Sequence, residues 1–322
     1  MRYKRDFILL GIMVITAICA VGLTIFFNPN HSLQKKNVQI TASFYPMYII
    51  ARNITDGMDN VSLSCMAQNQ TGCLHDYQIT TTDMKVLEST DIFIMNGGGM
   101  ESFLEDIVLN YPMLHIVDAG KEFGISESAK EELFDKEEHS HKEEHDHKEE
   151  INAHFWLNPA YYILQVQTIA DELAKLDQDH AKQYQENAKI YIEKVRKLAN
   201  KMQTELEVPN IGVIVFHDAF VYLAEYLGLS VVHTMEIDSE TSLNAGEIAE
   251  IMEQIQKGNV EILFTEAQYS TRIADTIGKE TNVAVYVIDS LVTGKEDKDS
   301  YLRGMESNLE LLKQAFSKKA DR

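Results

Sequence analysis

Short runs of β-branched and other apolar residues alternate with stretches of helical periodicity from Val38 onward, and this alternation restricts the fold more than any other feature of the sequence. The pattern is typical of parallel α/β units, in which a strand is followed by a helix. The predicted strands are Val38–Ala42, Val61–Met66, Ile92–Met95 and Leu114–Val117, followed by Ile211–Phe216, Val231–Met235, Val260–Phe264 and Val283–Ile288. These two sets predict an N-terminal α/β lobe over residues 38–176 and a C-terminal α/β lobe over residues 208–317.

A long helix is predicted between the two sets, at residues 177–206. Its apolar residues recur at alternating steps of three and four positions and form one stripe, namely Ala181, Tyr184, Ala188, Tyr191, Val195, Leu198 and Met202. We expect Asp177 or Asp179 to cap its start, and Pro209 prevents it from running further. The predicted architecture is therefore two lobes, each with a mainly parallel sheet flanked by helices, joined by one rigid helix and separated by a cleft.

The N-terminus combines a basic flank with a long uncharged stretch. Arg2, Lys4 and Arg5 precede residues 7–27, which carry no charge and are long enough to span a bilayer as a helix. The basic flank is expected to stay inside, so the rest of the chain would be exported. We interpret residues 1–28 as an uncleaved signal anchor and 29–37 as a linker. The alternatives are cleavage as a signal peptide and lipidation at Cys19.

The remaining two cysteines are Cys65 and Cys73. In an exported protein, a pair that closes a short loop is expected to form a disulfide. The alternative is that Cys73, two residues before His75, contacts a metal ion.

The formal net charge of the chain is −21, which argues against nucleic acid as a partner because phosphates require a basic surface. Many of the acidic residues lie in a segment at residues 130–150 with almost no apolar side chain, and we expect it to form a mobile surface loop. The same segment contains four histidines, His139, His141, His145 and His147, which could take up metal ions weakly.

Four of the eleven histidines have an ordinary structural interpretation. His31 and His180 are expected to be solvated. His115 and His233 lie inside predicted strands, where a packed and hydrogen-bonded imidazole is the default.

Three other histidines and one aspartate occupy positions typical of a binding site. His217 and Asp289 directly follow predicted strands, and ligands of open α/β sheets collect beyond the carboxyl ends of strands. His75 lies in a glycine-containing turn, and His154 precedes a helix start at Asn158-Pro159. Three imidazoles and one carboxylate suit tetrahedral Zn²⁺ better than Mn²⁺. Composition and spacing alone leave this quartet as one grouping among several.

Six motifs in order make the sequence similar to a known family. They are Ala42-Ser43-Phe44-Tyr45-Pro46, His75-Asp76-Tyr77, His154-Phe155-Trp156-Leu157-Asn158-Pro159, Phe216-His217-Asp218-Ala219-Phe220, Phe264-Thr265-Glu266-Ala267-Gln268-Tyr269-Ser270 and Val287-Ile288-Asp289-Ser290-Leu291. With them the chain resembles the zinc- and manganese-binding solute-binding proteins of ABC importers from Ile40 to Phe316.

The resemblance implies that His75, His154, His217 and Asp289 bind the metal ion. A histidine at the position of His217, and an acidic histidine-rich loop, are typical of zinc-specific members. The turn before His75 departs from the family pattern, since it has Cys73 and no proline.

Four further residues are candidates for supporting the site. Asp218, Glu236 and Glu266 are expected either to hydrogen-bond a metal-bound histidine or to be ordinary cleft carboxylates. Trp156 is expected to pack beside the site rather than to touch the ion.

The resemblance implies a zinc-capture subunit at the extracytoplasmic face of the cell membrane, which would deliver Zn²⁺ to an ABC permease energised by a cytoplasmic ATPase. We expect a monomer that is not an enzyme. The alternatives are manganese capture, a metal-dependent surface adhesin and a zinc hydrolase. A hydrolase would need an open coordination position, which four protein ligands would close.

Overall fold

The computed structural model describes residues 37–68, 74, 77–104, 111–123, 151–234, 245–257, 260–266 and 271–320. The expected N-terminal anchor, the turn with Cys73 and His75, and the histidine-rich loop lie outside these residues. Among the described residues no helix combines the length and the apolar character that a membrane span requires.

The first sheet contains four parallel strands in the order β2-β1-β3-β4. These strands are β1 (Val38–Ala42), β2 (Val61–Cys65), β3 (Ile92–Met95) and β4 (His115–Asp118). Among its helices are α2 (Tyr45–Ile54) and α3 (Thr81–Glu88), the latter capped by Thr80. The chain returns from β2 to the other side of β1, so the crevice between the ends of β1 and β3 is a topological switch point, the place where open α/β sheets bind ligands.

The second sheet repeats this plan, with four parallel strands in the order β6-β5-β7-β8. Its strands are β5 (Gly212–Val215), β6 (Ser230–Thr234), β7 (Val260–Glu266) and β8 (Ala284–Ile288). Its helices include α8 (Val221–Leu227), α9 (Ala245–Lys257), α10 (Thr271–Thr281) and α11 (Ser300–Ala320). The switch point of this sheet lies between β5 and β7. Two parallel-sheet α/β lobes flanked by helices confirm the expected fold class, whereas the residue limits expected for the lobes stay a prediction.

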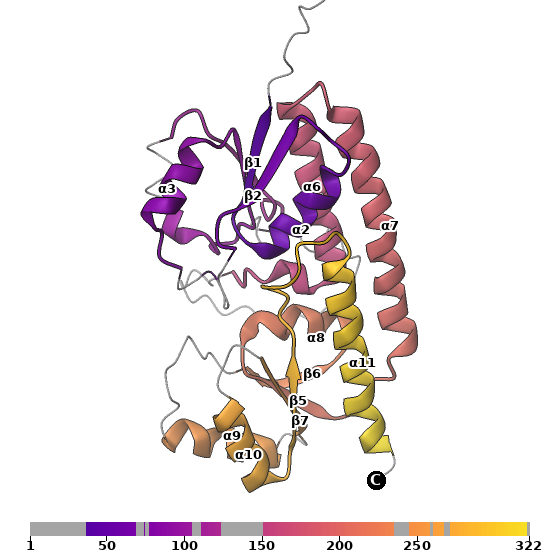
Figure 1. Ribbon diagram of the computed structural model, residues 1–322. Coiled ribbons are helices and arrows are strands. Elements are labelled where there is room, and N and C mark those ends of the chain that lie inside the picture. Colours follow the sequence, from indigo (N-terminus) through magenta and orange to yellow (C-terminus); the bar gives the residue numbers. More distant parts are fainter. Residues whose placement is uncertain are drawn as a thin grey trace, which may run out of the picture. The chain divides into compact units, whose positions relative to one another are not determined.

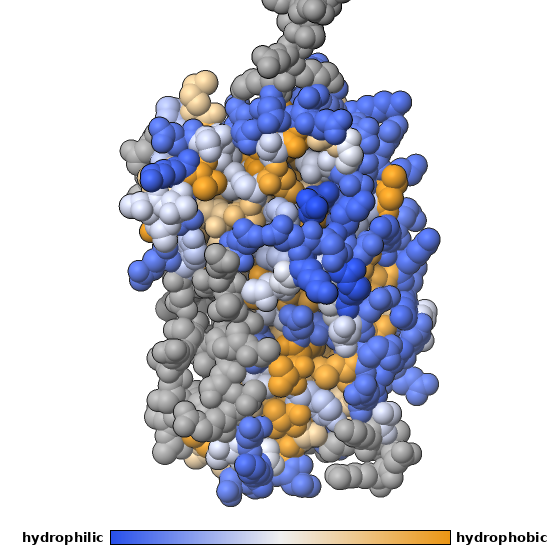
Figure 2. Space-filling model, in the orientation of Figure 1, coloured by the Kyte–Doolittle hydropathy of each residue, from blue (hydrophilic) through white to orange (hydrophobic). Residues whose placement is uncertain are grey.

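Two long helices lie between the sheets along the chain, α6 (Pro159–Leu176) and α7 (Ala181–Glu205), and α7 corresponds to the predicted connecting helix. Figure 1 shows α7 running beside α6 and then beside α11, and α7 also contacts α2. The predicted apolar stripe of α7 is buried from Tyr184 to Met202 and joins the main hydrophobic core. On the face drawn in Figure 2, most of the coloured surface is hydrophilic, with smaller apolar areas between.

The start of α7 differs from the expectation. The helix begins after His180 rather than after a capping aspartate, and His180 makes no side-chain cap. The Asp177 carboxylate instead pairs with His180 Nδ1 at 2.6 Å and accepts a hydrogen bond from the Tyr184 hydroxyl at 2.8 Å. His180 is only 13% exposed, so the expectation of a solvated histidine was wrong.

One further expectation needs correction. His115 is exposed rather than packed, because β4 is the edge strand of its sheet and its first residues lie outside the core. Cys65 is a free thiol in this structure, and burial raises its pKa to about 12. Its expected partner Cys73 lies outside the described residues, so the disulfide stays a prediction. His233, in β6, is half-buried.

Candidate metal centre

His154 is held at the start of a short turn that leads into α6. The 3₁₀ helix η3 (Phe155–Leu157) follows it, and the Asn158 side chain then accepts the Ala160 N–H at 2.9 Å, as its predicted N-cap role requires. Pro159 occupies the first turn of α6, where a missing N–H costs nothing. This local sequence fixes the backbone, and the His154 side chain is fully buried.

His217 leaves the end of β5 at the switch point of the second sheet. Its backbone is still extended, and the 3₁₀ helix η4 (Asp218–Phe220) begins directly after it. His217 Nδ1 lies 2.7 Å from Oε1 of Glu266, the last residue of β7. Because a carboxylate only accepts, Nδ1 donates to Glu266, which leaves Nε2 of the neutral ring as the nitrogen that can bind a metal ion. The geometry of Glu266 agrees with the predicted role of orienting a metal-bound histidine.

The two imidazoles come together from distant parts of the chain. Their ring centroids lie 4.7 Å apart with an interplanar angle of 81°. Asp218 completes a group of three, with Oδ1 at 3.2 Å from His217 Nε2 and 3.5 Å from His154 Nδ1. Within the described part of the chain, no other His, Cys, Asp or Glu residues form a group of three compact enough for a metal ion. Two imidazoles and a carboxylate are donors that fit Zn²⁺.

Asn152 is a site residue that the sequence interpretation missed. Its side-chain oxygen accepts both the backbone N–H of His154 at 3.0 Å and the hydrogen of His154 Nδ1 at 2.8 Å. Its amide nitrogen donates to the carbonyl of Asp218 at 2.8 Å. An amide oxygen cannot donate, so His154, like His217, has its proton on Nδ1, and Nε2 is the nitrogen of the neutral ring that can bind a metal ion.

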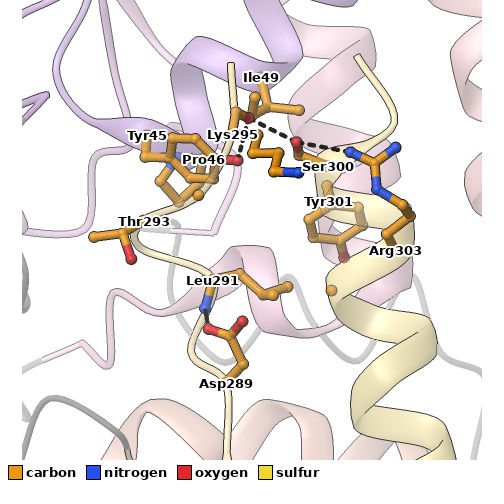
Figure 3. A pocket seen from close by; sticks show the side chains of 12 residues that line it. Tyr45, Pro46, Ile49, Asp289, Leu291, Thr293, Lys295, Ser300, Tyr301 and Arg303 are labelled. Atoms are coloured by element: carbon orange, nitrogen blue, oxygen red, sulfur yellow. Dashed lines mark hydrogen bonds between the residues drawn. The ribbon is translucent and has the colours of Figure 1, made fainter. Parts of the chain in front are cut away.

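Asp289 follows β8, as predicted, but it does not belong to the group of three. Its Oδ1 accepts the backbone N–H of Leu291 at 2.8 Å (Figure 3). Partial burial raises the pKa of the Asp289 carboxyl, the Leu291 N–H lowers it, and the charge of Glu266 raises it further. Asp289 also lines a pocket of about 180 Å³ together with Tyr45, Tyr301 and other residues drawn in Figure 3.

The turn after Asp289 holds an uncommon backbone conformation. Leu291 has a φ of 61°, in the left-handed region that a leucine rarely adopts, and it is buried. Such a conformation costs on the order of 1–3 kcal/mol and persists only where the surrounding contacts enforce it. The hydrogen bond from the Leu291 N–H to the Asp289 carboxylate is one of those contacts.

Trp156 is fully buried beside the candidate site, with its ring centroid 5.2 Å from that of His154. Its indole N–H donates to the carbonyl of Ser290, next to Asp289, at 2.8 Å. The tryptophan therefore packs beside the site, as expected, and also bonds to the segment that carries Asp289. His75, the four loop histidines and Glu236 lie outside the described residues.

Comparison with known proteins identifies relatives along most of the chain. Residues 40–315 match the protein family described as zinc-uptake complex component A, periplasmic. The high-affinity zinc uptake system protein ZnuA of Bacillus subtilis is 28% identical over 286 residues, which cover 87% of this chain and 88% of that protein. The zinc-binding protein AdcA of Streptococcus pyogenes serotype M6 is 26% identical over 298 residues. That match covers 87% of this chain but 56% of the streptococcal protein, so the chain spans little more than half of this relative.

Solved structures share the fold. The solute-binding protein FpvC of Pseudomonas aeruginosa, in complex with Mn²⁺, superposes with a TM-score of 0.74 at 23% identity, covering 88% of this chain and 100% of that one. AdcAII of Streptococcus pneumoniae has a TM-score of 0.70 at 24% identity, with the same coverages. The resemblance inferred from the six motifs is thereby confirmed. Since the matched residues run through both lobes and include His154, His217 and Asp289, this chain belongs to the family of periplasmic zinc-uptake complex component A proteins.

Proposed function

We propose that this chain captures Zn²⁺ outside the cytoplasm and delivers it to the permease of an ABC importer. The observation that carries the proposal is the pair His154 and His217, which come from different lobes and have ring centroids 4.7 Å apart. The Nδ1 atom of each ring is hydrogen-bonded to a protein oxygen. Metal-bound histidines characteristically have such oxygen partners, which fix the ring and its tautomer. The relatives named for zinc uptake or zinc binding point to the same ion.

The proposed ligands are His75, His154, His217 and Asp289. Three imidazole nitrogens and one carboxylate oxygen would close a tetrahedral Zn²⁺ site, without the open position that catalysis requires. The role of the protein is accordingly binding and transfer rather than chemistry. Support for Asp289 comes from its place after β8, in a turn where its carboxylate accepts the N–H of Leu291, a residue in the left-handed conformation.

The remaining parts of the chain would serve attachment and supply. Residues 7–27 are proposed to anchor the protein to the membrane, which would keep the loaded site close to the permease. His139, His141, His145 and His147 are proposed to collect Zn²⁺ weakly and to raise its concentration near the cleft. Energy would come from a separate ATPase, since the sequence has no Gly-x-x-x-x-Gly-Lys-Ser/Thr motif.

Metal titration of the purified full-length chain tests the proposal. We expect one tight Zn²⁺ per chain in competition with a chromophoric chelator, and weaker Mn²⁺ binding, because nitrogen-rich sites favour Zn²⁺ over Mn²⁺. His217→Ala should remove the tight site, whereas His180→Ala, at the start of α7, should leave it intact. Tight binding that survives His217→Ala would refute the ligand assignment. Failure of the intact chain to support growth of zinc-starved cells lacking their own capture protein would refute the transport role.

A further inference from the structure

The segment from Asn152 to Trp156 crosses between the lobes and carries His154 at its centre. On the N-terminal side, the Asn96 amide, after β3, donates to the Ala153 carbonyl at 2.8 Å. On the C-terminal side, two side chains of the segment donate hydrogen bonds, one on each flank of His154. The two bonds reach different segments, and each of these segments carries another proposed ligand.

The first bond runs from Asn152 to the segment of His217. The Asn152 amide nitrogen donates to the carbonyl of Asp218, the residue next to His217, at 2.8 Å. Because the oxygen of the same amide accepts from His154, one side chain orients the His154 ring and ties it to the His217 turn. The Tyr222 hydroxyl donates back to the Asn152 carbonyl at 2.9 Å, so the connection is reciprocal.

The second bond runs from Trp156 to the segment of Asp289. The indole N–H donates to the Ser290 carbonyl at 2.8 Å, and the whole indole is buried. The Tyr301 hydroxyl, at the start of α11, donates back to the Trp156 carbonyl at 2.9 Å. A buried hydrogen bond of this kind is costly to leave unmade, because the carbonyl and the indole N–H would both lose their partner away from water.

We propose that Asn152 and Trp156 are positioning residues for the metal ion, which together hold the segments of His154, His217 and Asp289 in one arrangement. The inference rests on the proposed function, and we name the pair the Asn152/Trp156 clamp. Neither side chain needs to touch the ion. The clamp ties together the segments of three of the four proposed ligands, so binding does not have to order these segments separately, and preorganisation of this kind raises affinity.

Substitutions that remove one bond at a time test the clamp. Asn152→Ala should weaken Zn²⁺ binding about 10–100-fold, the range found when the outer partners of metal ligands are removed. Asn152→Asp keeps an acceptor for His154 but loses the donor to Asp218, so it separates ring orientation from the connection between segments. Trp156→Phe removes the indole N–H and should also weaken binding about 10–100-fold.

The tautomer of His154, that is, which ring nitrogen carries the proton, can be measured separately, and a general loss of stability would not change it. In metal-free protein, ¹⁵N NMR should show the proton on Nδ1 in the wild type and in Asn152→Asp, and a mixture of tautomers in Asn152→Ala. This measurement needs no zinc, so it tests the orienting half of the clamp even if the proposed function fails. If the wild type bound no Zn²⁺, the proposed function would fall independently of this result.

Two matched controls lose comparable bonds away from the site. Asn187→Ala on α7 removes an asparagine that donates to the carbonyls of Ile54 and Asp56, and Tyr191→Phe removes the buried hydroxyl contact with Tyr162. Both should lower the midpoint of thermal unfolding and leave Zn²⁺ affinity within about twofold. If Asn152→Ala and Trp156→Phe fold and also stay within twofold, the clamp is refuted. If Trp156→Phe does not fold, Asn152→Ala decides on its own, since unchanged Zn²⁺ affinity there would refute the clamp.

Discussion

His217 Nδ1 and Glu266 Oε1 lie 2.7 Å apart and join the carboxyl ends of the two central strands of the C-terminal sheet. Glu266 is fully buried, and its contact with His217 connects this carboxylate to the candidate metal site. The contact gives His154 and His217 unequal partners, since His154 bonds to the neutral amide of Asn152 and His217 to a carboxylate. A carboxylate partner makes an imidazole a stronger metal ligand than an amide does.

The first prediction follows from that inequality. Glu266→Gln keeps an acceptor for Nδ1 but removes the negative charge, so Zn²⁺ affinity should fall about tenfold, and Glu266→Ala should cost about 100-fold because the ring also loses its orientation. Chelator competition at fixed pH measures both. Glu280→Gln, an exposed charge removal on α10, serves as the control. Equal affinity of the wild type and Glu266→Ala would contradict the role assigned to Glu266.

The second prediction separates two carboxylates. If Asp289 is the oxygen ligand, Asp289→Asn should weaken Zn²⁺ binding more than 100-fold, and Asp218→Asn should weaken it about tenfold through lost charge near His217. The absorption spectrum of the Co²⁺-loaded protein should change strongly with Asp289→Asn and little with Asp218→Asn. The reverse order would identify Asp218, which lies 3.2 Å from His217 Nε2, as the oxygen ligand.

The third prediction concerns Glu101, a buried acid at the switch point of the N-terminal sheet. It accepts hydrogen bonds from Ser43 Oγ at 2.7 Å and from the backbone N–H groups of Asn96 and Gly97 at 2.8 and 3.1 Å. Burial nevertheless raises the pKa of Glu101 from 4.5 to about 7, because the hydrogen bonds that favour the carboxylate do not offset the loss of water. The folded state therefore binds a proton more tightly than the unfolded state.

The sign of the pH dependence follows from this raised pKa. The contribution of Glu101 to stability is complete below about pH 4.5 and is lost as the pH rises through about 7. Between roughly pH 5.5 and roughly pH 8.5 the wild type should lose about 2 kcal/mol of unfolding free energy more than Glu101→Gln, which cannot ionise. Urea unfolding of metal-free protein at the two pH values measures the difference. Parallel changes in both proteins would show that Glu101 does not titrate in this range.

The strands were predictable because their apolar runs are dense in β-branched residues and both sheets are parallel. β1 and β3 have the predicted ends, and the other strands differ by one or two residues. The start of α7 was not predictable from capping preference. The Asp177 carboxylate that could have capped it is used by His180 and Tyr184, and that competition depends on tertiary packing.

The candidate site also contains residues that could be predicted from the sequence and residues that could not. His217 could be predicted because a histidine directly after a buried strand reaches the ligand edge of a parallel sheet. Asn152 could not be predicted, because its importance lies in a bond to the Asp218 carbonyl, 66 positions away, which no local pattern encodes. An asparagine two residues before a candidate ligand is the single signal that could have drawn attention to it, because such a side chain can bond to the following backbone.

The last prediction concerns the connection between β8 and α11, which follows Asp289 and packs on α2. The Tyr45 hydroxyl donates to the Lys295 carbonyl at 2.7 Å, and the Asn53 amide donates to the Lys298 carbonyl at 2.9 Å. A Cβ on Gly294 would lie 2.4 Å from the Tyr45 hydroxyl oxygen and 2.9 Å from the ring carbon that carries it. Gly294→Ala should therefore destabilise the fold by about 1–3 kcal/mol, since either the ring or the connection must shift.

A double-mutant cycle tests the cause. Tyr45→Phe should cost about 1 kcal/mol for the lost hydrogen bond. In the Tyr45→Phe background, Gly294→Ala should cost less stability than in the wild type. The hydroxyl oxygen that the new Cβ would meet is absent, and the hydrogen bond from Tyr45 to the Lys295 carbonyl has already been lost. The expected coupling is on the order of 1 kcal/mol, measured by urea unfolding. Strictly additive costs would mean that the alanine is accommodated without moving Tyr45. The connection begins directly after Asp289. If Tyr45 and Gly294 are coupled, we therefore expect both substitutions to lower Zn²⁺ affinity as well, which would link the packing of α2 to the proposed metal site.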